Sequence, residues 1–202
     1  MRKYSRLDLI NNAVIDHTGG LLNRLFESKY ARLNIHVPLY DLKRAKVFVG
    51  TINEIIKDEI DDIYTVEELI NLLFLDFLRQ IDRGMNFDTL AKWISSVKQD
   101  ENNSELSINY YLEEKDELNI EDLKQHFKRK NTKKEESAYI SVKIEKQYVL
   151  RGEVLLHDLQ ELYPALQLNV EEFLTLRFKD IMSQIKSGNY QILKNIVEIL
   201  TS

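Results

Sequence analysis

The chain has 202 residues, of which 44% are hydrophobic and 30% are charged, and its net charge is −5. This length and hydrophobicity allow a substantial core, and the low glycine and proline content favours helices over turn-rich β architecture. The absence of cysteine excludes disulfides, thiol nucleophiles and thiolate metal sites. The negative net charge provides no overall attraction to nucleic acids or anionic membranes.

The first part of the chain predicts helices with one short strand. Apolar residues at helical spacing occupy residues 7–15 and 21–26. Residues 33–37 alternate between apolar and polar side chains, which predicts a strand that ends before Pro38. An amphipathic helix of about five turns is expected from Asp41 onward.

The segment from residue 65 to residue 97 predicts two capped helices. In Thr65-Val-Glu-Glu68, Thr65 and Glu68 can cap each other at a helix N-terminus. The helix is expected to end at Arg83-Gly84, and Asn86 is expected to cap the next one. The most apolar run, residues 69–78, is shorter than the roughly 20 residues that a membrane span needs, so we expect a buried helix there.

The second part of the chain predicts a mixture of strands and helices. Alternation predicts strands over residues 106–112 and 140–144, the latter extending as far as Leu150, with a short helix over 119–130 between them. Because two strands are marginally stable alone, a third is expected from residues 33–37 or from a partner chain. Helices are then expected over 153–163, over 170–186 behind the cap Asn169-Val-Glu-Glu172, and over 192–200.

Together these elements predict a mainly α fold with a small β element, of the α+β class. The polar stretch 98–104 is the best domain boundary, with a helical domain at 1–99. An α+β domain is expected at 104–202, in which a two- or three-stranded sheet packs on the C-terminal helices. One continuous core shared by both parts is the alternative.

The motifs that would indicate catalysis are incomplete. Gly19-Gly20 follows His17 and Thr18 without the lysine and the further glycines of a phosphate-binding loop, so a joint between helices is the favoured interpretation. His157 and Glu161 share a helix face at i, i+4, but further metal ligands are not evident. No G-x-S-x-G motif is present. We therefore predict no catalytic residues, no resident metal and no cofactor.

An acidic cluster precedes the helix that begins after Thr65. Carboxylates at the C-terminal end of a helix oppose its dipole and should reduce its stability. A solvated corner between helices is the favoured interpretation. Contact with a basic partner, or a divalent cation held by oxygen ligands, are the alternatives. The candidate residues are Asp58, Glu59, Asp61 and Asp62.

Charge is distributed unevenly in the second part of the chain. Residues 98–122 hold nine acids and two bases, whereas residues 123–151 hold nine bases and three acids. Mutual neutralisation of these blocks is favoured over binding of nucleic-acid phosphates, because the whole chain is acidic. The candidate contacts for nucleic acid or an acidic partner are Lys124, Lys128, Arg129, Lys130, Lys133 and Lys134.

These observations predict a non-enzymatic, cytoplasmic adaptor or regulatory protein that acts through protein–protein contacts, as a subunit of a larger bacterial or phage complex. A protein partner or self-association is expected, and a membrane partner is not. Two alternatives stay open. The first is a nucleic-acid-binding regulator that uses residues 124–134. The second is a divalent-metal-dependent enzyme centred on residues 58–62.

Overall fold

The computed structural model describes residues 3–10, 12, 28–98 and 136–201. Over these ranges the protein is mainly helical with a two-stranded antiparallel sheet, which confirms the predicted fold class. Residues 87–98 are helical as well. The principal elements are β1 (Tyr30–Pro38), α3 (Leu39–Ile56), α4 (Val66–Asp82), β2 (Ser137–Glu145), α7 (Lys146–Leu162), α8 (Val170–Lys186) and α9 (Gln191–Thr201).

The sheet joins two segments that lie far apart in the sequence. β1 and β2 pair over their whole lengths, from Tyr30 opposite Glu145 to Pro38 opposite Ser137. The strands expected at 33–37 and 140–144 are therefore confirmed, each in a longer form, and they are partners of each other. The predicted strand 106–112 lies outside the described residues, and so does the predicted helix 119–130.

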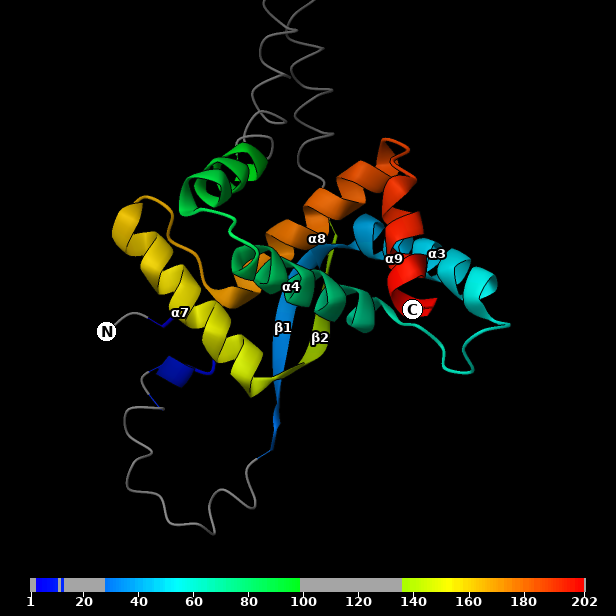
Figure 1. Ribbon diagram of the computed structural model, residues 1–202, viewed down its shortest axis with the longest axis horizontal. Helices are drawn as coiled ribbons and strands as arrows, with labels where there is room; N and C mark the ends of the chain where they lie inside the picture. The colour runs from blue at the N-terminus through cyan, green and yellow to red at the C-terminus, as the bar shows by residue number, and fades with distance from the viewer. Residues whose placement is uncertain (1–2, 11, 13–27, 99–135, 202) are drawn as a thin grey trace, which may run out of the picture.

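One face of the sheet forms part of the core. The side chains of β1 and β2 alternate between the core and the solvent, because successive strand residues point to opposite faces. α8 packs on β1 and α4 packs on β2, and Figure 1 shows α4 crossing in front of the two strands. The buried side chains are Ala31, Leu33, Ile35, Val37, Ile140, Val142 and Ile144.

A single hydrophobic cluster unites the described parts of the chain. It takes side chains from β1 through to α9, and Phe74, Phe173 and Phe178 are among its largest fully buried members. In Figure 1, α7 lies on one side of the sheet, and α3 with α9 lies on the other. The segment 99–104, in which the domain boundary is predicted, lies outside the described residues, so the division into two domains stays a prediction.

The predicted helix caps are present. The Thr65 side chain accepts a hydrogen bond from the Glu68 amide, and the Glu68 carboxylate accepts one from the Thr65 amide. Asn169 and Glu172 form the same reciprocal pair at the start of α8. After α4 the chain turns at Gly84, whose φ of 97° is in the left-handed region that glycine tolerates.

The start of α7 differs from the prediction. We expected the strand to run as far as Leu150 and the helix to begin at about Glu153, but β2 ends at Glu145 and α7 begins at Lys146. The prediction is wrong because alternation stops at Glu145. From there the buried residues Val149, Gly152 and Leu156 recur every three or four positions, which is the helical spacing.

Gly152 permits the close approach of α7 to α4. A Cβ at this position would lie 2.8 Å from Cζ of Phe74, a ring that is only 1% exposed. Alanine in place of glycine normally stabilises a helix by about 1 kcal/mol, but this clash should reverse the sign. We expect Gly152→Ala to destabilise the protein by about 1–2 kcal/mol in urea unfolding.

Gly50 in α3 provides the matched control, because a Cβ there meets no heavy atom within 4 Å. Gly50→Ala should therefore stabilise the protein by about 0.5–1 kcal/mol in the same measurement. Stabilisation by both substitutions would contradict the close packing of Gly152 against Phe74.

Candidate functional site

The structure describes only some of the residues that the sequence singles out. The basic candidates at 124–134 lie outside the described residues, as do His17 and Gly19-Gly20. The acidic candidates at 58–62 and the pair His157–Glu161 are described. The described candidate residues lie on the loop between α3 and α4 and on the surface of α7.

Two hydrogen bonds made by one asparagine side chain stabilise the loop from α3 to α4. Nδ2 of Asn53 donates to the carbonyl oxygen of Tyr64 at 2.9 Å, and Oδ1 of Asn53 accepts from the Tyr64 amide at 2.9 Å. At the start of the loop, the amides of Glu59 and Ile60 both donate to the Ile56 carbonyl. These bonds hold the loop in one conformation at both of its ends.

The loop presents charge and apolar surface together. The side chains of Asp58, Glu59, Asp61 and Asp62 are all exposed. Two large apolar side chains border them, Ile55 at 48% exposure and Ile63 at 77%. We call these six residues the acidic corner.

The carboxylates of the acidic corner do not converge on a cation. Among the described residues, only His157, Asp158 and Glu161 bring three candidate ligand atoms within 4.8 Å of one another. A divalent cation bound by protein oxygens needs several ligands at roughly 2–2.6 Å. The acidic corner therefore resembles a charged contact surface more than a metal site.

Tyr64 directly follows the acidic corner in the sequence and is buried. Its ring is 8% exposed and its hydroxyl has no hydrogen-bond partner among the described residues. Burial raises the pKa of the Tyr64 phenol well above its usual value, and the charge of Glu68 adds to the shift. Tyr64 is therefore neutral at physiological pH and contributes no charge to the acidic corner.

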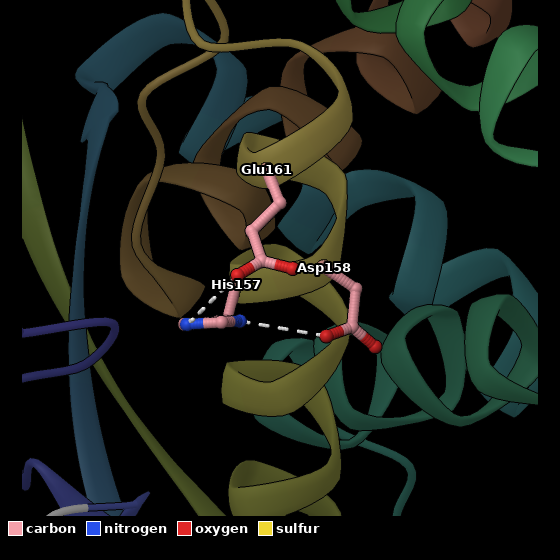
Figure 2. A group of neighbouring side chains, drawn as sticks. All are labelled: His157, Asp158 and Glu161. Atoms are coloured by element: carbon pink, nitrogen blue, oxygen red, sulfur yellow. Dashed lines mark hydrogen bonds and ion pairs between the residues drawn. The ribbon is translucent and has the colours of Figure 1, made fainter.

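The group on α7 is a surface cluster on a single helix, as Figure 2 shows. Nδ1 of His157 lies 3.4 Å from a carboxylate oxygen of Asp158, and Nε2 lies 3.9 Å from one of Glu161. The predicted i, i+4 neighbours are therefore close, and Asp158 joins them. Each ring nitrogen of His157 already has a carboxylate beside it. The cluster by itself therefore does not define a metal centre.

A third carboxylate on α7, that of Glu153, is fully buried, and no pattern in the sequence predicts its burial. Glu153 is 0% exposed and receives hydrogen bonds from the Ser5 hydroxyl and from the amides of Leu9 and Ile10, at 3.1 and 2.8 Å for the two amides. These donors belong to the N-terminal segment, whose Tyr4 carbonyl also accepts from the Val170 amide. Glu153 therefore anchors this segment to the helices and is not available for chemistry.

Arg177 on α8 is a partly buried charge. Its guanidinium lies 3.7 Å from Asp180, 3.9 Å from Asp76 on α4, and 5.3 Å from the ring centroid of Trp93. Burial lowers the pKa of Arg177, while the two carboxylates act in the opposite direction. The group is an ion-paired contact between α4, α8 and the helix at 87–98.

An open pocket of about 610 Å³ lies between the helix at 87–98 and the turn after α7. Its hydroxyl groups already have hydrogen-bond partners. The Tyr163 hydroxyl donates to Asp88, which raises the pKa of Tyr163. The hydroxyls of Ser95 and Ser96 donate to helix carbonyls. A nucleophile paired with a base is therefore not found among the described residues that line this pocket.

Comparison with known proteins gives no assignment, since the chain matches no family model, no curated protein and no solved structure. None of the described helices has the length and apolar character that crossing a membrane requires. Any functional conclusion therefore depends on the surfaces described above.

Proposed function

We propose that the protein is a non-enzymatic adaptor that binds a partner protein through the acidic corner. The observation that carries this proposal is the combination of exposed carboxylates with the exposed side chains of Ile55 and Ile63, on a loop that Asn53 holds in place. A loop that is ordered before binding loses little entropy when a partner docks.

The chemistry of the acidic corner indicates what such a partner would present. Apolar anchors that become buried supply most of the binding energy at a protein interface, and surrounding charges accelerate association and select the partner. The two isoleucines suit the first role and the carboxylates suit the second. The partner would offer an apolar patch bordered by lysine or arginine.

Substitution in the acidic corner tests this proposal. The tagged chain would be purified from its natural host with and without Asp61→Lys/Asp62→Lys and Ile63→Ser, and any co-purified protein would be quantified. We expect the unsubstituted chain to co-purify with a stoichiometric amount of one partner. The amount of co-purified partner should fall by at least about ten-fold with the substituted chain. Light scattering after gel filtration would reveal whether the partner is a second copy of the chain.

The surface of α7 offers a matched control. Val154, Asp158 and Glu161 are one apolar and two acidic side chains with exposures of 45%, 51% and 71%. The variant Val154→Ser/Asp158→Lys/Glu161→Lys makes the same changes of charge and apolarity and should retain the partner. A monomer without a partner, or a partner lost equally with both variants, would contradict the proposal.

A further inference from the structure

The face of the sheet that points away from the core is solvent-exposed over its whole length. Its residues lie directly opposite one another in pairs, and one of these pairs is Arg32 with Lys143. All of its members are polar or aromatic, and all but the partly buried Glu145 are exposed. We call this surface the open sheet face, and its residues are Tyr30, Arg32, Asn34, His36, Tyr139, Ser141, Lys143 and Glu145.

The open sheet face carries two positive charges that form no ion pair with the described residues. Like charges directly opposite in a sheet are destabilising, yet Arg32 and Lys143 face each other. The acid on the same face, Glu145, forms an ion pair with Lys29 at 2.9 Å and accepts a hydrogen bond from the side-chain Nε2 of Gln147 at 2.7 Å. Within the described ranges, neither Arg32 nor Lys143 has an ion-pair partner. A bound anion would relieve this repulsion.

Aromatic rings lie beside these cations. Tyr139 is 77% exposed, and its ring centroid lies 4.9 Å from that of His36, its neighbour across the strands. Tyr30 is 40% exposed, and Nζ of Lys143 lies 4.3 Å from its ring centroid. Proteins that bind single-stranded nucleic acid stack the bases on exposed aromatic rings and neutralise the phosphates with cations. The open sheet face has both kinds of side chain, and it also has the side-chain amide of Asn34.

We propose that the open sheet face binds single-stranded nucleic acid, with bases stacked on Tyr30, His36 and Tyr139 and phosphates held by Arg32 and Lys143. This site is separate from the acidic corner, and the inference goes beyond the proposed function. A single strand is favoured over a duplex because the bases of a duplex are stacked on each other and their faces are not available to the tyrosines. An acidic protein partner would use the two cations but would leave the rings without a role.

The test is fluorescence anisotropy with labelled oligo(U) and oligo(dT) of about 15 nucleotides, compared with a duplex of the same length. We expect the full-length chain to bind single strands more tightly than the duplex, and the affinity to fall between about 50 and 200 mM salt. Tyr139→Ala should weaken binding by about 5- to 100-fold. Lys143→Glu should weaken it about ten-fold or more, whereas Lys143→Arg should preserve it. The ratio of the affinity for oligo(U) to the affinity for oligo(dT) shows whether RNA or DNA is the preferred single strand.

Two controls use exposed residues outside the sheet. Tyr190 is 79% exposed before α9, and Lys194 is exposed on α9, so Tyr190→Ala and Lys194→Glu match the two substitutions in type. Circular dichroism would verify that each variant is folded. No binding at about 50 mM salt, equal affinity for the duplex, or equal losses with the controls would each overturn the proposal.

Cross-linking separates this site from the basic segment. Ultraviolet irradiation of the complex followed by mass spectrometry should place adducts on the peptides that contain Tyr30 or Tyr139. The opposite result would have two parts: adducts confined to residues 124–134, and loss of binding only in the variant Lys128→Glu/Arg129→Glu/Lys130→Glu. That result would assign binding to the basic segment and overturn the open sheet face as the site. The acidic-corner variants should leave oligonucleotide affinity unchanged, so failure of one proposal is distinguishable from failure of the other.

Discussion

Replacement of Glu153 by alanine should lower the free energy of unfolding by about 3–5 kcal/mol. The substitution removes the acceptor for the Ser5 hydroxyl and for the amides of Leu9 and Ile10 and leaves a cavity in a fully buried position. Buried donors without acceptors cost much more than the net gain of an ordinary hydrogen bond. In a chain of this size, we expect the melting temperature to fall by about 10 °C.

Local measurements distinguish an anchor from a general core residue. The amides of Leu9 and Ile10 should exchange with solvent much faster in Glu153→Ala, and the N-terminal segment should become the first site of proteolysis. Ser5→Ala removes one of the three donors and should cost about 1 kcal/mol. Glu161→Ala, on the exposed side of the same helix, should change stability by less than about 0.5 kcal/mol. Unchanged exchange at Leu9 and Ile10 would contradict the anchoring role.

Truncation of Phe173 should be equally severe, with an expected loss of about 3–5 kcal/mol for Phe173→Ala. This side chain is 1% exposed, and its ring centroid lies 4.2 Å from that of Phe77 and 5.7 Å from that of Trp93. It thereby joins α8 to α4 and to the helix at 87–98. Its removal leaves a cavity that three helices border and that cannot close without moving one of them.

The single tryptophan makes this prediction easy to check. Because Trp93 also donates from its ring nitrogen to Asp180 at 3.2 Å, loss of the Phe173 ring should change its fluorescence emission as well as the urea midpoint. Tyr190→Ala truncates an aromatic residue that is 79% exposed, and it should change neither quantity appreciably. A small stability loss with unchanged emission would show that Phe173 is not central to the core.

Local signals in the sequence predicted local structure well. The reciprocal caps at Thr65 and Asn169 depend on residues three positions apart, so the motif itself contains the geometry. The start of α7 was misplaced because Lys146 to Leu150 follow a strand directly, without a turn residue to mark the change. The helical spacing becomes clear only when Val149 is read together with Gly152 and Leu156.

Relations between distant residues could not be predicted in the same way. The burial of Glu153 depends on the docking of Ser5 and Leu9, more than 140 positions away, and an isolated glutamate on a helix normally indicates a solvent-exposed position. The open sheet face could be predicted from the sequence only in part. The alternation at Asn34 and His36 and at Ser141 and Lys143 indicated one wet side on each strand, but only the pairing register brings Arg32 opposite Lys143.

The distance between the two strands along the chain also governs how the protein must be made. Pro38 and Ser137 are neighbours in the sheet but are separated by about a hundred residues, which a ribosome needs on the order of 5–20 s to add. During synthesis β1 emerges with its apolar side chains and its backbone edge uncovered, and it must stay soluble until its partner is translated. A nascent chain in this state is a natural substrate for a chaperone, and starved or stalled translation should increase its aggregation.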